Sequence, residues 1–134
     1  MASTLETLKL EAEKVATKAH APYSNFSVGA AVLSKTGQIY TGCNVENISS
    51  GLTVCAERNA IGKAVAEEGS SFEIVEIFVT NKNSDGKTVH CSPCGACRQV
   101  MAEFSKAETV VHYCGDTDLI TTDMNALLPD SFTF

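Results

Sequence analysis

The segment Cys94-Gly-Ala-Cys97, which directly follows Pro93, restricts the fold of this chain more than any other feature. It opens a stretch with helical spacing, and residues three apart on a helix lie on one face, so both sulfurs can converge on one ion. A firmly held metal needs further protein ligands. Cys55 is the best remaining candidate, because it also opens a predicted helix after a polar loop. The fold must therefore bring two distant helix starts together.

Three cysteine ligands leave the fourth position of a tetrahedral zinc ion open, as in a catalytic site and unlike a closed structural site. Water would occupy that position. Glu57 lies two residues after Cys55 and can face this water without binding the metal, so it is the candidate general base and acid. Three thiolates leave the zinc site with a charge of about −1. We expect the neighbouring Arg58 guanidinium to hydrogen-bond the ligand sulfurs and draw charge from them.

Length and charge narrow the class of protein. A chain of 134 residues predicts a single domain, 1–134, with its own hydrophobic core. Its net charge of −6, with no basic cluster, disfavours a nucleic-acid partner and favours a small uncharged or cationic ligand. The sequence shows neither a long apolar run nor a secretory signal, so we expect no membrane partner and a cytoplasmic location. In a reducing compartment, the six cysteines indicate metal binding or catalysis.

The spacing of apolar residues predicts an α/β fold. The expected elements are a helix from Ser3 to about Lys18, strands at 28–33 and 38–43, a helix at 55–68, a strand at 74–79, a helix at 94–104, a strand at 109–113 and a short helix within 121–128. Ser3 and Glu6 have the form of a capping box. This order implies helices packed on the faces of a mixed sheet, a three-layer α/β/α sandwich.

Four short motifs resemble one enzyme family. Cys55-Ala-Glu57 and Pro93-Cys94-Gly-Ala-Cys97 resemble the zinc signature of deaminases that attack a nucleobase. Asn44-Val-Glu46-Asn47 and Tyr23-Ser-Asn-Phe26-Ser-Val-Gly-Ala resemble the small, homotetrameric cytidine deaminases. The similarity runs from about Pro22 to Phe132. Each motif is weak alone, but four of them in family order in a chain of family length form a specific signal.

The resemblance implies a reaction. Members of this family hydrolyse cytidine and 2'-deoxycytidine to uridine and 2'-deoxyuridine in pyrimidine salvage, with release of ammonia. One zinc ion per subunit would provide a hydroxide that attacks C4 of cytosine, and Glu57 would shuttle the protons. The partners it implies are a small nucleoside substrate and further copies of the chain in a homotetramer.

The resemblance also implies the substrate-binding residues. Asn44 and Glu46 would bind ribose hydroxyls, Phe26 would stack on the pyrimidine, and the backbone of Ala56 would contact the base. Phe132 would close the site of a neighbouring subunit. The chain departs from the family at Ser50, where members commonly carry an aromatic residue, so a stacking contact between subunits is expected to be missing.

Each of these residues also has a structural interpretation. A Cys-x-x-Cys pair occurs in structural zinc knuckles and redox motifs, and Cys91 adds an iron–sulfur pattern that lacks its fourth close cysteine. Cys43, Cys91 and Cys114 are expected to be small buried residues and not ligands. Without the resemblance, Phe26 would be a core residue and Glu46 a solvated charge. The histidines His20, His90 and His112 are expected to be surface or hydrogen-bonded residues and not ligands. Glu67-Glu68 is expected to be a solvated helix end.

Three other functions compete with cytidine deamination. A deaminase of another cytosine nucleoside, of the antibiotic type, would share the zinc residues but not the sugar-binding loop, and Asn44 and Glu46 argue against it. A non-catalytic zinc-stabilised domain would bind metal without needing Glu57. A role in RNA or DNA editing is opposed by the acidic balance and by the lack of basic patches interleaved with aromatics.

Overall fold

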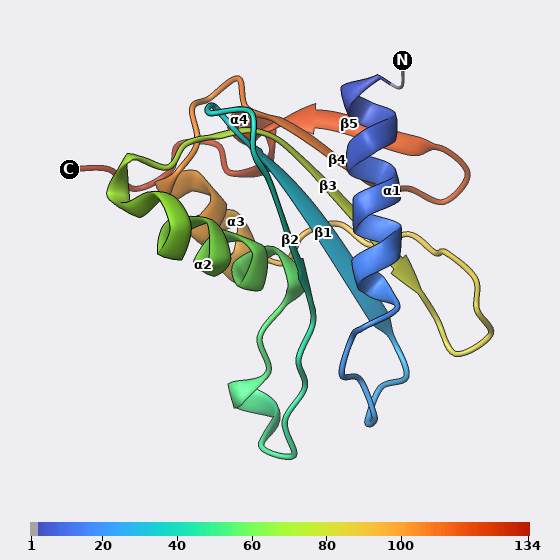
Figure 1. The fold of residues 1–134 in the computed structure, drawn as a ribbon. Coiled ribbons are helices and arrows are strands. Elements are labelled where there is room, and N and C mark those ends of the chain that lie inside the picture. The colour runs from blue at the N-terminus through green and yellow to red at the C-terminus, as the bar shows by residue number, and fades with distance from the viewer. Residues whose placement is uncertain (1–2) are drawn as a thin grey trace.

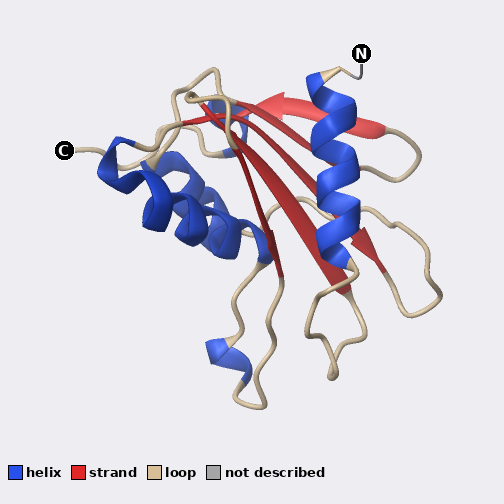
Figure 2. Ribbon diagram, viewed as in Figure 1, coloured by secondary structure: helices blue, strands red, loops and turns tan. Residues whose placement is uncertain are grey.

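The computed structural model describes residues 3–134 as one mixed sheet with helices on both faces (Figures 1 and 2). The elements in chain order are α1 (Thr4–Ala16), β1 (Ser27–Ser34), β2 (Ile39–Cys43), the 3-10 turn η1 (Ser50–Leu52), α2 (Ala56–Glu68), the 3-10 turn η2 (Gly69–Ser71), β3 (Ile74–Lys82), α3 (Gly95–Glu103), β4 (Val110–Cys114), β5 (Leu119–Asp123) and α4 (Met124–Leu127). The strand order is β2-β1-β3-β4-β5; β3 and β4 are parallel and the other neighbours are antiparallel. The predicted α/β/α sandwich is confirmed.

Helix α1 covers one face of the sheet (Figure 1). It begins where predicted, because the Ser3 hydroxyl accepts a hydrogen bond from the Glu6 N–H at 3.1 Å and so satisfies one free donor of the first turn. Its buried side chains, Leu8 and Ala12, pack on Phe78 of β3. No helix within residues 3–134 is both long and apolar enough to cross a bilayer.

Helices α2 and α3 cover the opposite face and enclose the larger core (Figure 2). Ile61 of α2 and Met101 of α3 pack in this core with Val111 of β4. Helix α2 lies directly on β2 at Gly42, where a Cβ atom would stand only 2.4 Å from the backbone nitrogen of Ala60. A side chain at this position would push α2, and the residues at its start, away from the sheet.

The C-terminal part differs from the prediction. Residues 119–123 form the edge strand β5, and the short helix predicted within 121–128 is confined to Met124–Leu127. Leu119 and Ile120 are exposed, so the edge strand lacks the buried alternation by which a strand is identified from sequence. The side chain of Asp123 accepts a hydrogen bond from the Ala126 N–H at 2.8 Å and caps the short helix.

The interpretation of Glu68 as a solvated helix end is wrong. Its carboxylate accepts hydrogen bonds from the hydroxyls of Ser34, Thr36 and Tyr40, each at 2.8 Å, and so joins the end of α2 to the β1–β2 hairpin. Burial raises the pKa of Glu68, but the three hydroxyl donors and nearby Lys35 outweigh it, and the pKa is lowered overall.

Replacing this carboxylate should destabilise the fold in a pH-dependent way. Because the folded pKa of Glu68 lies below its unfolded value of about 4.3, its contribution is complete above that value and is lost as pH falls through the folded pKa. Urea unfolding should therefore show Glu68→Gln less stable than the original protein at neutral pH, with the gap narrowing in acid. The exposed Glu67→Gln variant is the control. A Glu68→Gln deficit that stays constant down to acid pH would contradict this role.

Candidate active site

A cavity of about 260 Å³ lies where the loop after β2 meets the starts of α2 and α3. Its lining residues come from 24–28, 44–57, Val79 of β3 and 91–94. Of the residues proposed from the sequence, Phe26, Asn44, Glu46, Cys55, Ala56, Glu57 and Cys94 line it. Segments far apart in the sequence thus line one cavity.

The sulfurs of Cys55, Cys94 and Cys97 form the metal-binding group that the spacing predicts. Their Sγ atoms lie within 4.8 Å of one another, and those of Cys55 and Cys94 are 3.9 Å apart. Cys55 and Cys94 are the N-cap residues of α2 and α3, where the helix dipole favours negative charge, and Cys97 is fully buried in α3. No other group of three such ligands exists among residues 3–134.

Arg58 contacts this group as expected. One of its terminal nitrogens, Nη2, donates to the Cys55 sulfur at 3.6 Å. The Arg58 Nε is buried and has no hydrogen-bond partner. The hydrogen bond to Cys55 raises the pKa of Arg58, which keeps the side chain charged. A fixed cation beside three sulfurs suits a site that binds a metal through thiolates.

The thiols of Cys55 and Cys97 do not ionise independently. The interaction with Cys97, assisted by Arg58 and Cys94, outweighs burial and lowers the pKa of Cys55 to about 5. The same interaction and burial raise the pKa of Cys97. A negative charge on Cys55 is therefore favoured, and a further charge on Cys97 requires a bound cation. This donor set fits zinc, which binds deprotonated cysteine.

Glu57 lies in the first turn of α2 with its side chain 4% exposed, and it lines the cavity next to the sulfurs. Burial, supported by the negative charge of Cys55, raises the pKa of its carboxyl group. A carboxyl group that ionises closer to neutral pH than an exposed one is suited to both accept and donate a proton.

Asn44 and Glu46 also line the cavity, and both hold the loop that precedes β1. The Asn44 side chain accepts from the Val28 N–H at 2.8 Å and donates to the Phe26 carbonyl at 2.9 Å. The Glu46 carboxylate accepts from the backbone N–H of Tyr23 at 3.0 Å. Both residues therefore have structural bonds that the sequence did not predict.

Glu46 also binds Ser24 through both the backbone N–H, at 3.2 Å, and the hydroxyl. The bond from the Ser24 hydroxyl is the largest influence on the Glu46 carboxyl group and lowers its pKa. Glu46 is thus an ionised, fixed acceptor at the cavity wall, not a freely solvated charge.

Of the remaining residues proposed from the sequence, two line the cavity and one lies outside it. Phe26 and the fully buried Ala56 line the cavity. Phe132 is 73% exposed, does not line this cavity, and contacts Phe134 near the end of the chain. Ser50 lines a neighbouring hollow with Tyr23 and Ile48. The role of Phe132 at a second subunit therefore stays a prediction.

Several lining residues, notably Thr53, Cys91 and Ser92, are not among the site residues predicted from the sequence. Thr53 and Ser92 each lie two residues before a predicted metal ligand, and this proximity is the signal that could have found them. Cys91, like Cys43 and Cys114, is half-buried, a free thiol and no part of the sulfur group.

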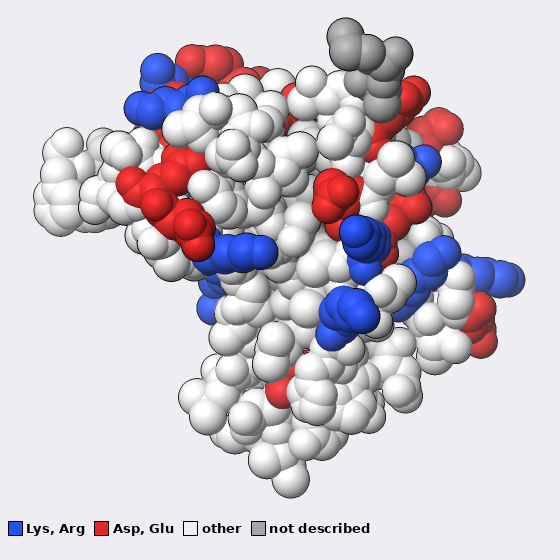
Figure 3. Space-filling model, in the orientation of Figure 1, with Lys and Arg blue, Asp and Glu red and all other residues white. Residues whose placement is uncertain are grey.

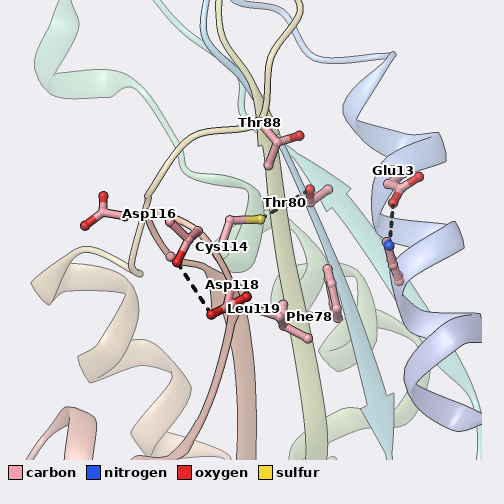
Figure 4. Close-up of a pocket in the computed structure, with 11 residues that line it drawn as sticks. Glu13, Phe78, Thr80, Thr88, Cys114, Asp116, Asp118 and Leu119 are labelled. Carbon is pink, nitrogen blue, oxygen red and sulfur yellow. Dashed lines mark hydrogen bonds and ion pairs between the residues drawn. The ribbon is translucent and has the colours of Figure 1, made fainter.

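A larger cavity, of about 360 Å³, lies on the other face of the sheet between α1 and the β4–β5 connection (Figure 4). Its labelled side chains include Glu13 of α1, Thr80 of β3 and Cys114 of β4, with Asp116 and Asp118 at the connection. It contains neither the sulfur group nor a buried carboxyl group. The metal-ligand cysteines and the buried Glu57 are instead found at the smaller cavity.

Comparisons with known proteins agree with this geometry. The profile of the family described as "Cytidine and deoxycytidylate deaminase zinc-binding region" matches residues 2–114. The chain is 41% identical over 130 residues to a cytidine deaminase of Sporosarcina psychrophila, covering 96% of this chain and 91% of the relative. It is 32% identical over 109 residues to a blasticidin-S deaminase of Bacillus cereus, covering 79% of this chain and 76% of that one.

The fold agrees as well. The crystal structure of a cytidine deaminase from Burkholderia pseudomallei superposes with a TM-score of 0.83 and 41% sequence identity, covering 97% of this chain and all of that one. Sequence profile, relatives and fold point to one conclusion. The chain belongs to the family of zinc-dependent cytidine and deoxycytidylate deaminases.

Proposed function

We propose that this protein catalyses the hydrolytic deamination of cytidine and 2'-deoxycytidine to uridine and 2'-deoxyuridine, with release of ammonia, in cytoplasmic pyrimidine salvage. The observation that carries the proposal is the position of the buried Glu57 carboxyl group, next to three cysteine sulfurs in a cavity of about 260 Å³. Six free thiols suit a reducing compartment.

Cys55, Cys94 and Cys97 would hold the zinc ion. When bound there, zinc supplies a water molecule whose pKa is lowered by the charge of the ion. The hydrogen bond from Arg58 to the Cys55 sulfur supports this assignment, because a guanidinium there offsets the negative charge of the ligand sulfurs. Cys55 and Cys94 line the cavity together with Glu57, and the buried Cys97 lies behind them, so the metal would be held beside the proton carrier.

Glu57 moves the protons in this scheme. It takes one proton from the attacking water and gives it to N3 of the cytosine ring, as the oxygen–C4 bond forms. It then passes a second proton from the added hydroxyl group to the exocyclic nitrogen, the C4–N bond breaks, and ammonia leaves. The raised pKa of Glu57 supports this double role, since the carboxyl group must be first a base and then an acid.

The rest of the cavity suits a neutral nucleoside. Asn44 and Glu46 would bind the ribose hydroxyls with the acceptor and donor positions that their structural bonds leave free, and Phe26 would stack on the pyrimidine ring. The backbone of Ala56 would contact the base. No lysine or arginine is among the residues that line the cavity, so nothing there attracts a 5'-phosphate.

The relationship to blasticidin-S deaminase favours a second candidate, a deaminase of an antibiotic cytosine nucleoside. The metal ligands and Glu57 would be the same, and the sugar-binding residues would differ. Asn44 and Glu46, the residues proposed to bind ribose, line the same cavity as Glu57 and the ligands Cys55 and Cys94. This placement supports cytidine as the substrate.

Ultraviolet absorbance of cytidine incubated with zinc-loaded protein tests the function directly, because loss of the exocyclic amine changes the chromophore. Conversion to uridine is the expected result, and 2'-deoxycytidine and blasticidin S are assayed in parallel. Conversion of blasticidin S alone would establish the second candidate. No conversion of any of the three by fully loaded protein would favour a non-catalytic zinc-stabilised domain.

We further propose that the protein acts as a homotetramer. Ile48 and Leu52, in the loop after β2, and Tyr23, in the loop before β1, are large apolar residues exposed to solvent. The end of the molecule that this region forms carries few charged side chains (Figure 3). A second copy would cover this apolar surface, and its Phe132 would close the cavity. Sedimentation equilibrium should give four chains per particle, and a monomer would contradict the proposal.

Loss of Arg58 should weaken both metal binding and turnover. Removing a group that tunes metal ligands typically costs about tenfold to a hundredfold in metal affinity or activity. We expect Arg58→Ala to release zinc faster to a coloured chelator and to deaminate cytidine more slowly. Lys63→Ala removes an exposed cation from the same helix and serves as the control. Unchanged release and turnover in Arg58→Ala would refute the role.

A further inference from the structure

We infer that Arg98 is a positioning residue for the Cys94 sulfur. Its guanidinium holds the peptide unit that precedes Cys94 and joins it to the end of α4. The inference rests on the proposed role of Cys94 as a metal ligand, and it assigns a specific task to a side chain that touches neither the cavity nor the sulfurs.

Two hydrogen bonds carry the inference. The Nε of Arg98 donates to the carbonyl of Pro93 at 2.7 Å, and Nη1 donates to the carbonyl of Leu127 at 3.0 Å. Arg98 is half-buried and directly follows the buried Cys97 on α3. A single side chain thus links the backbone directly before a predicted metal ligand to the backbone of α4.

The bond to Pro93 fixes Cys94 because a peptide unit is planar. Holding the Pro93 oxygen sets the plane that contains the nitrogen and Cα of Cys94, and so restricts where the Cys94 sulfur can point. Cys94 needs such support more than the other two ligands, since it is exposed whereas Cys55 is half-buried and Cys97 is fully buried. It also caps α3 without a side-chain hydrogen bond to that helix.

The residue type suits this task. Arg58 and Arg98 are the only arginines in the sequence, and the other eight cationic residues are lysines. Arg58 binds the Cys55 sulfur, and Arg98 binds the carbonyl before Cys94, so both arginines serve the sulfur group. A guanidinium offers several donors in a rigid plane and can hold two carbonyls in fixed directions, which one ammonium on a flexible stem does less well.

The bond to Leu127 connects the metal-binding segment to the C-terminus. This carbonyl is at the last turn of α4, where backbone acceptors have no partner within the helix. Arg98 supplies that partner. The chain beyond α4, which carries the exposed Phe132, therefore leaves the body of the protein from a point held by the same side chain.

Replacement of Arg98 should disturb the metal site without unfolding the protein. In Arg98→Met the donors are lost and most of the stem is kept, and we expect zinc to transfer to a coloured chelator about tenfold to a hundredfold faster. In protein loaded with Co²⁺, the thiolate-to-cobalt and visible bands should shift, because they report the geometry of the ligands. Arg98→Lys keeps the charge but not the planar donors, so it should recover only part of the original behaviour.

The control is Lys106→Met, which removes an exposed cation paired with Glu73 at 3.7 Å and should leave the metal readouts unchanged. Circular dichroism verifies that each variant is folded. If Arg98→Met unfolds, the zinc release and cobalt spectrum of Arg98→Lys test the inference instead. The inference would be overturned if folded Arg98→Met, or Arg98→Lys, released zinc at the same rate as the original protein and had the same cobalt spectrum. Failure of the original protein to show thiolate–cobalt bands would instead refute the proposed metal site itself.

Discussion

Glu57→Gln is expected to lose cytidine deamination by about a hundredfold to ten-thousandfold, the range that general acid–base catalysis contributes. The substitution keeps the size of a side chain that is almost fully buried beside the sulfurs, so folding and zinc content should be retained. Glutamine can hydrogen-bond the substrate, but it can neither accept the proton of the attacking water nor deliver one to the amine. The loss should therefore appear in kcat more than in KM. Steady-state kinetics with metal analysis measures it.

Two further substitutions in α2 make this test more specific. Glu57→Ala should lose activity at least as far as Glu57→Gln, because it removes both the proton carrier and the side chain that fills its place. Glu67→Gln removes an exposed carboxylate from α2 and should remain near the original rate. Near-normal turnover in zinc-loaded Glu57→Gln would end the assignment of Glu57 as the proton carrier.

The metal-binding group could be predicted from the sequence because its constraints are local. Cys94 and Cys97 are placed together by the helix spacing, and each of the two segments begins with a cysteine at a helix N-terminus. Glu57 follows from its distance of two residues from Cys55. Within each segment the relevant geometry spans less than one helix turn, whereas the tertiary fold brings the two helix starts, and so Cys55 and Cys94, together.

Residues with partners from distant segments could not be predicted in this way. His112 is buried on β4 and binds Glu76 of β3 and Thr121 of β5, so its acidic partner is defined only by the strand register. Glu68 similarly finds its hydroxyl donors across the β1–β2 hairpin. A sequence pattern reports such side chains as polar and leaves their partners unassigned.

The same limit applies to Asn44 and Glu46, the predicted sugar-binding residues of the cavity. The resemblance to cytidine deaminases indicated ribose binding for Asn44 and Glu46, whereas the structure adds their bonds to the loop that carries Phe26. These bonds connect the shape of the cavity to its hydrogen-bonding groups. A substitution at either position would displace the loop as well as remove a ligand for the sugar, so its effect on KM cannot be attributed to a lost contact alone.

Loss of a single cysteine of the sulfur group should remove both zinc and activity. In Cys97→Ala only Cys55 and Cys94 remain, and two protein ligands retain zinc poorly. Cys97 is fully buried in the core between α2, α3 and the sheet, so the change also leaves a small cavity. We expect Cys97→Ala to contain little zinc after dialysis, to unfold at a lower temperature, and to deaminate cytidine at no more than about a hundredth of the original rate.

Zinc-dependent stability separates metal loss from the cavity effect. Metal that binds only the folded state stabilises it, so chelation should lower the melting temperature of the original protein and barely change that of Cys97→Ala. Cys43→Ala, which removes a half-buried thiol outside the sulfur group, should keep its zinc and its response to chelation. If Cys97→Ala retained one zinc per chain after dialysis, the ion would have to be held by other residues, and the assignment of this group would fail.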